Sequence, residues 1–128
     1  MATQRLTKHN AAMIRAGVAL KADRESDALL LLLDGMADWK RISELTDAPR
    51  STVIVAVDTM ADLDGAAEAG LKPLALNKEK APLLERLQEA LLEAAADELI
   101  RTNGDVIAVY SGFQQGRLDS VSHLQLHQ

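Results

Sequence analysis

Apolar and polar residues follow one another in two different patterns along this chain, and the patterns predict its strands and helices. Short runs that are apolar throughout are typical of strands buried on both faces, whereas apolar residues three or four positions apart indicate helices with one buried face. Runs of the first kind occur at 28–33 and within 51–59 and 103–112, and a weaker one lies within 71–77. The second occurs at 7–24, 36–49, 60–70 and 79–102.

The run Ala28–Leu33 needs a decision, because leucine alone would also suit a helix. The run is short for a helix, and it is followed at once by Asp34-Gly35, a pair typical of turns. We therefore predict a strand buried on both faces. Segment 51–59 is the clearest strand, since its core is valine and isoleucine, and it ends in an acid, Asp58.

The last segment, 117–128, alternates between apolar and polar residues, with one phase slip at 120–122. This alternation predicts a half-exposed antiparallel strand at the edge of the sheet, joined to the preceding strand through the loop 111–116. The predicted order is therefore α-β-α-β-α-β-α-β-β. Three βαβ steps indicate one α/β domain over residues 1–128, with a parallel sheet and helices on both faces.

Composition and charge narrow the function. The 128 residues carry a net charge of −5, with one Trp, one Tyr and one Phe, which argues against nucleic-acid binding because phosphate affinity needs a basic surface. The absence of cysteine excludes disulfides and sulfur-ligated zinc. No apolar run approaches the ~20 residues that span a bilayer, and the N-terminus lacks the apolar core of a secretion signal. We expect a cytoplasmic protein that binds neither membrane nor nucleic acid.

Four segments of the sequence are similar to a known family of α/β domains. They are AGVALKADRESDALLLLLDG, STVIVAVDT, EAGLKPLALNKE and NGDVIAVYSGFQQGRLDSVSHLQL. In this order they resemble the C-terminal α/β domain of pyruvate kinase over almost the whole chain, and Gly104-Asp105 before an apolar strand is the most specific feature. The resemblance implies a three-layer αβα fold with a mostly parallel five-stranded sheet of order 3-2-1-4-5, in which strand 5 is antiparallel.

That strand order implies a switch point between the first and fourth strands, where open α/β sheets bind ligands. In pyruvate kinases the two loops beside it hold a sugar-phosphate effector, one of them through a Thr/Ser-Gly-Arg-Ser type sequence. Here this loop is Asp34-Gly35-Met36-Ala37-Asp38, with two carboxylates in place of the hydroxyls and the arginine. Because phosphate needs N–H donors and cations, we expect a cation or an amine instead.

From this position we predict a ligand site formed by Asp34, Gly35, Asp38, Ser111 and Gly112. Asp34 also forms a candidate metal pair with Asp58, because both follow strands that would be neighbours. The alternative for each acid is ordinary turn and helix-cap chemistry. The alternative for Ser111 and Gly112 is the geometry of the hairpin loop.

A second similarity concerns the ending YSGFQQGRLDSVSHLQL, which resembles the segment joining a small N-terminal module to the diadenylate cyclase domain of some bacterial proteins. The cyclase's own motifs do not carry over. Asp64-Gly65-Ala66 matches three letters of one motif but falls in a predicted short helix, and no Arg-His-Arg follows it. The resemblance implies an accessory or sensor module of such a protein.

Our favoured hypothesis is a non-catalytic module that senses a small ligand or mediates association, attached to a diadenylate cyclase domain. The residues name no cofactor. The alternative is a small stand-alone metal-dependent enzyme that uses Asp34 and Asp58. A homo-oligomer formed through the last strand is a further option, because unpaired edge strands readily pair with other chains.

Overall fold

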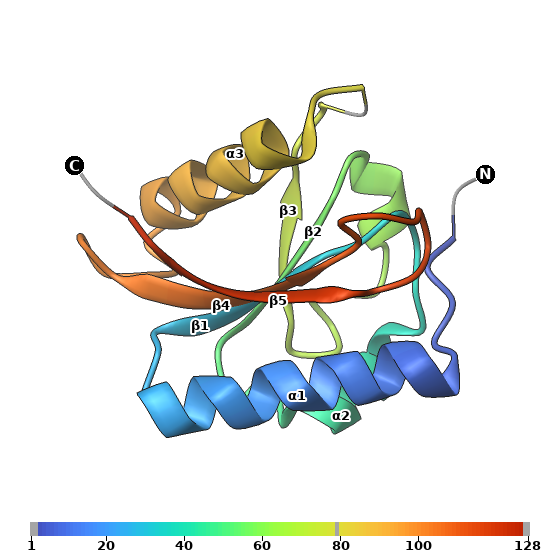
Figure 1. Cartoon of the computed structure of the whole chain (residues 1–128), viewed down its shortest axis with the longest axis horizontal. Coiled ribbons are helices and arrows are strands. Elements are labelled where there is room, and N and C mark those ends of the chain that lie inside the picture. The colour runs from blue at the N-terminus through green and yellow to red at the C-terminus, as the bar shows by residue number, and fades with distance from the viewer. Residues whose placement is uncertain (1–2, 79, 127–128) are drawn as a thin grey trace.

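One five-stranded sheet with helices on both faces makes up the computed structural model, which describes residues 3–78 and 80–126 (Figure 1). The helices are α1 (Lys8–Arg24), α2 (Trp39–Thr46), the 3-10 helix η1 (Met60–Leu63) and α3 (Leu83–Ala96). The strands are β1 (Ala28–Leu32), β2 (Val53–Val57), β3 (Lys72–Ala75), β4 (Asp105–Tyr110) and β5 (Ser120–Gln125).

The strand order is β3-β2-β1-β4-β5, with parallel pairing from β3 to β4 and antiparallel pairing between β4 and β5. Both the order and the direction of β5 confirm the fold that the sequence predicted. The run of leucines is the central strand, since Leu30 pairs with Ile54 of β2 on one side and with Ala108 of β4 on the other. No described helix is long and apolar enough to cross a membrane.

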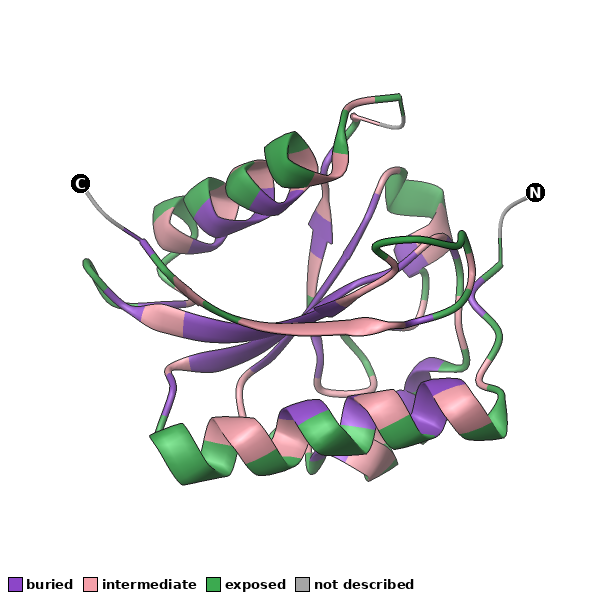
Figure 2. Ribbon diagram, viewed as in Figure 1, coloured by how far each residue is buried: buried purple, intermediate pink, exposed green. Residues whose placement is uncertain are grey.

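The sheet separates two hydrophobic cores, and alternate residues of each inner strand enter different ones. Leu29 and Leu31 of β1 pack with α1 and α2, in a core that includes Ile14 and Ile42. Leu30 and Leu32 pack on the opposite face, in a core built largely on α3. Every residue of β1 and β2 is therefore buried, as the purple strands in the centre of Figure 2 show.

Helix α1 lies very close to the sheet, and Gly17 is what allows it. A Cβ built on Gly17 would lie 2.6 Å from Val109 Cγ2 and 3.1 Å from Leu29 Cδ1. The start of the helix is as predicted, because the Thr7 side chain accepts a hydrogen bond from the Asn10 N–H.

Three predicted helices are shorter in the structure. Helix α2, predicted over 36–49, spans only Trp39–Thr46. Helix α3 begins after Pro82, because a proline disfavours helical backbone in the residue before it. The helix ends at Ala96, and Glu98 then takes a left-handed conformation with φ 59° as the chain turns inward to the buried Ile100. The segment predicted as a helix over 60–70 forms only η1 and a series of turns. The predicted start at residue 79 and the last residues, 127–128, lie outside the described residues.

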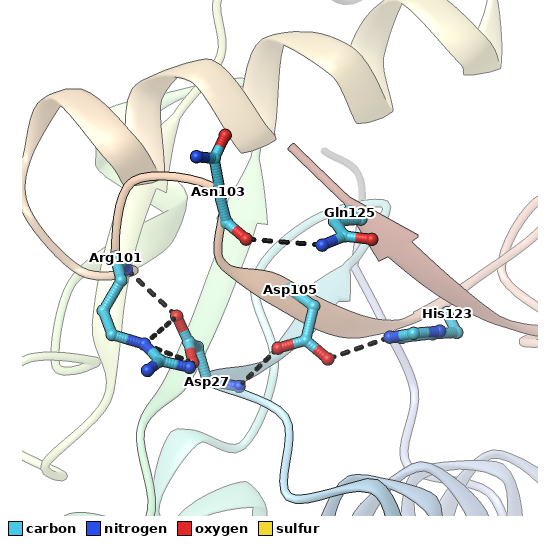
Figure 3. Close-up of polar contacts among 6 residues, drawn as sticks. All are labelled: Asp27, Arg101, Asn103, Asp105, His123 and Gln125. Atoms are coloured by element: carbon cyan, nitrogen blue, oxygen red, sulfur yellow. Dashed lines mark hydrogen bonds and ion pairs between the residues drawn. The ribbon is translucent and has the colours of Figure 1, made fainter. Parts of the chain in front are cut away.

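A network of carboxylates clamps the amino-terminal ends of β1 and β4 (Figure 3). Asp27 accepts hydrogen bonds from the Arg101 backbone N–H at 3.0 Å and from the Arg101 guanidinium, with Nη2–Oδ1 at 2.6 Å. Asp105 accepts from the Asp27 N–H at 3.1 Å and contacts His123 Nε2 at 2.8 Å. The network thus joins β1 and β4 to the loop after α3 and to β5.

The pKa values of both acids follow from these partners. The side-chain hydrogen bond from Arg101 is the main cause that holds the pKa of Asp27 below its usual value. Burial is the largest single influence on the pKa of Asp105 and raises it, but the hydrogen-bonding and charged partners, of which His123 is the strongest, together leave that pKa lowered. Both groups are therefore stabilised as carboxylates in the folded state.

Gly17→Val should destabilise the fold by roughly 2–3 kcal/mol, because the added side chain overpacks the contact between α1 and the sheet. Chemical unfolding followed by circular dichroism measures the loss. Ala16→Val is the matched control, since it places the same side chain at the neighbouring exposed position of α1. Equal losses in the two variants would show that the close approach at Gly17 is not the cause.

Asp27→Asn should lower the melting temperature at neutral pH, and the difference from wild type should shrink as the solution is made acidic. A carboxylate whose pKa is lowered by folding contributes stability that is fully present above its unfolded pKa, about 3.9. That contribution is lost as the pH falls through the folded pKa. Melting curves between neutral and strongly acidic pH test this, with Asp23→Asn at an exposed position of α1 as the control. A difference that stays constant down to strong acid would contradict it.

Candidate functional site

A cavity of about 650 Å³ opens at the carboxyl edge of the sheet. It lies beyond β1, β2 and β4, where the connection through α2 runs over one face of the sheet and the connection through α3 runs over the other (Figure 1). This is the switch point at which open α/β sheets bind ligands. Its lining consists of Asp34, Asp58, Thr59, Ala61, Asp62, Arg86, Ser111, Gly112, Phe113, Gln114 and Gln115.

Asp34 lies at the end of β1 and ties this strand to the loop between β4 and β5. Its Oδ2 accepts a hydrogen bond from the Gly116 N–H at 2.6 Å, and its own N–H donates to Gln4 Oε1 at 3.1 Å. One carboxylate oxygen of Asp34 is therefore engaged within the chain.

Two buried amides support the same loop from the amino-terminal segment. Gln4 Nε2 and Asn10 Nδ2 each donate to the Gly116 carbonyl at 3.0 Å. Asn10 Oδ1 also accepts from the Leu118 N–H at 2.9 Å. Because both amides are about 1% exposed, they replace water as the partners of the loop backbone.

A second carboxylate, Asp119, organises the first half of the loop. Its Oδ1 accepts from the Gly112 N–H at 2.7 Å and its Oδ2 accepts from the Phe113 N–H at 3.0 Å. These bonds, with the one from Gly112 the largest cause, lower the pKa of Asp119. Three backbone N–H groups of the kind that bind phosphate, those of Gly112, Phe113 and Gly116, are thus occupied by Asp119 and Asp34.

Asp58, at the end of β2, forms an ion pair with Arg86 of α3. Arg86 Nη2 lies 3.3 Å from Asp58 Oδ2, and the two side chains are 14% and 19% exposed. Within the described part of the chain, Arg86 Nε and Asp58 Oδ1 are buried and have no hydrogen-bond partner. The pair therefore has one contact, where an arginine and a carboxylate can make two.

The predicted site residues are only partly brought together. Asp34, Asp58, Ser111 and Gly112 all line the cavity, whereas Gly35 and Asp38 do not. Asp38 caps α2 instead, by accepting a hydrogen bond from the Arg41 N–H at 3.1 Å. Nowhere in residues 3–78 and 80–126 do three or more His, Asp or Glu side chains lie close enough together to hold a metal ion.

Sequence reasoning did not single out Arg86 or Phe113 for this site. Arg86 lies on the polar side of a helix, where an arginine usually faces water, so its spacing gives no signal. Phe113 is 94% exposed, and a lone phenylalanine in a polar loop is the one clue that the sequence offers.

The comparison with solved structures shows the fold. A pyruvate kinase from Cryptosporidium parvum matches with a TM-score of 0.64 and 15% sequence identity, over 90% of this chain and 22% of that chain. The chain therefore spans about a fifth of the enzyme's length, as the resemblance to one domain implied. No curated protein matches the sequence.

The comparison with families extends over nearly all of the sequence. Residues 9–128 match the family described as "Probable sensor domain DacZ_P". DacZ is a diadenylate cyclase-associated protein, so this match confirms the relation that the end of the sequence indicated. The chain belongs to the DacZ_P family of probable sensor domains.

Proposed function

We propose that the chain is a non-catalytic sensor module whose cavity binds a small molecule through an amine or guanidinium group. The observation that carries this proposal is the charge of the lining. Asp34, Asp58 and Asp62 supply three carboxylates, and Arg86 is the single cationic side chain among the lining residues. A concave wall with this excess of negative charge attracts cations.

The state of the loop supports the same choice. A sugar phosphate could use the N–H groups of Gly112, Phe113 and Gly116, but all three already donate to carboxylates of the chain. An incoming phosphate would have to displace those carboxylates and then lie beside them. An amine needs none of these three N–H groups.

The cavity has the size and the variety of groups that a small organic ligand requires. Its volume of about 650 Å³ lies within the usual range for ligand pockets. Gln114 and Gln115 offer amides for orientation, and the exposed ring of Phe113 offers a flat surface on which a cation can lie.

The rival function is a metal-dependent enzyme that uses Asp34 and Asp58. The observation in its favour is that both carboxylates line one cavity. Two carboxylates completed by water and substrate are a common way to hold Mg²⁺. Arg86 opposes this rival, because its guanidinium already neutralises Asp58.

Agmatine, which carries a guanidinium and an amine, should raise the melting temperature of the protein. At about 100 times its Kd, a ligand adds about 2.7 kcal/mol to the free energy of unfolding. Asp58→Asn should abolish the shift, because it removes the lining carboxylate that already pairs with a guanidinium within the chain. Asp38→Asn is the matched control, since Asp38 lies outside the lining and asparagine also caps helices.

The same assay separates the alternatives. Fructose bisphosphate or a nucleotide that stabilises the protein when agmatine does not would overturn the proposal. Stabilisation by Mg²⁺ or Mn²⁺ that is lost in both Asp34→Asn and Asp58→Asn would favour the rival enzyme.

We also propose association of two copies through β5, as a second role for the module. The two edges of the sheet differ in a way that favours it. The outer strand β3 carries Lys72 and Pro73, residues that discourage pairing, whereas β5 has the sequence SVSHLQ, with no proline, lysine or acid. The Leu126 N–H donates to the Gly104 carbonyl, so by alternation the backbone groups of Val121, His123 and Gln125 point away from β4.

His123→Pro should convert a dimer into a monomer, because it removes an outward N–H from the centre of β5. A proline with its N–H position facing outward is tolerated on an edge strand, so the pairing with β4 should survive. Sedimentation velocity at several concentrations measures the change. His123→Thr is the control, since it also lacks the imidazole but keeps the N–H. A wild-type chain that stays monomeric at all concentrations, or a dimer that persists in His123→Pro, would exclude this interface.

A further inference from the structure

We infer that the ligand of this cavity binds by displacing the Arg86 guanidinium from Asp58, and that this displacement releases the first turn of α3. The inference rests on the proposed function and adds to it a mode of recognition and an output. In this view, Arg86 occupies the place beside Asp58 that the amine or guanidinium group of a ligand would take.

The geometry of the Arg86–Asp58 ion pair indicates a weak contact that a ligand can displace. Among the described residues its single contact is 3.3 Å long, and Arg86 Nε and Asp58 Oδ1 are buried there without hydrogen-bond partners. An unpartnered polar atom away from water raises the free energy of the state that contains it. A ligand that pairs with both oxygens of Asp58 would remove one such defect, while the freed Arg86 could reach solvent from its place on the cavity wall.

The first turn of α3 depends on this contact more than the rest of the helix does. Pro82 makes no side-chain cap for the helix, and the buried residues of α3 begin only at Leu87. Before that point, the ion pairs that the described residues make with α3 are Arg86–Asp58 and a longer contact of 4.0 Å between Glu85 and Lys78. Loss of the first tie therefore leaves residues 83–86 held chiefly by the partly buried Leu83.

Release of this turn would change a surface that a partner protein could bind. Leu84 is 79% exposed and Leu92 is 49% exposed, so α3 already presents apolar side chains outward at two turns. A change in the position of the first turn would move Leu84 relative to Leu92. The cavity and the outer surface of α3 are thus connected through one side chain, Arg86.

Calorimetric titration of agmatine into wild type and Arg86→Ala tests the inference by the sign of the effect. Displacement predicts binding that is about threefold or more tighter in Arg86→Ala, because the ligand no longer has to break the ion pair. Lys80→Ala is the control for net charge, since it removes one positive charge from the exposed loop before α3. It should leave the affinity nearly unchanged.

Hydrogen exchange supplies a readout that charge alone would not move. Agmatine should speed the exchange of backbone N–H groups in the first turns of α3 of wild type. In Arg86→Ala these groups should exchange fast without ligand and change little when it is added.

Three other results would each contradict one part of the proposal. Weaker binding to Arg86→Ala would mean that Arg86 recognises an anionic group, and it would overturn displacement. Unchanged binding, or ligand that slows exchange in α3, would overturn it too while leaving the sensor proposal intact. Agmatine that binds neither wild type nor Arg86→Ala would overturn the proposed ligand class itself, and displacement with it.

Discussion

Complete burial of β1 on both faces is the constraint on which the rest of the structure depends. From Ala28 to Leu33 no residue is more than 3% exposed, so this strand needs a neighbouring strand on each side and helices above and below. The chain meets both needs because α1 and α2 cover one face of the sheet and α3 covers the other. Because β2 runs parallel to β1, Asp34 and Asp58 follow their strands at the same edge of the sheet. The cavity is thus a consequence of how the core is closed.

The elements of the fold were largely predictable because the two buried strands have distinct patterns. The six apolar residues before Asp34 and the valine-rich segment before Asp58 predict β1 and β2 from composition and length alone. The strand order came from the resemblance to pyruvate kinase, since periodicity does not say which strands are neighbours. The ends of α3 were not predictable from its leucine stripe. They are set by backbone restrictions at Pro82 and Glu98, which a hydrophobic pattern does not register.

The candidate site was predictable only where residues follow strands directly. Asp34 and Ser111 could be located from the topology, and both line the cavity. Asp38 lies in the same loop as Asp34, but its side chain caps the start of α2. Arg86 acts on Asp58, 28 residues away in sequence, from the α3 layer, and Asp119 acts across the hairpin loop on the N–H groups of Gly112 and Phe113. The roles of these two residues depend on the donors and acceptors that they contact, and those contacts exist only in the folded chain.

The two amides under the hairpin loop bear on how this module is delimited. The family match begins at residue 9, whereas Gln4, which braces both Asp34 and the loop at Gly116, precedes it. A boundary drawn by sequence similarity therefore cuts through the hydrogen bonds that fix one wall of the cavity. The Thr7 cap of α1 would be lost at the same cut. The part of the sequence that identifies the family is therefore shorter than the part that builds the cavity.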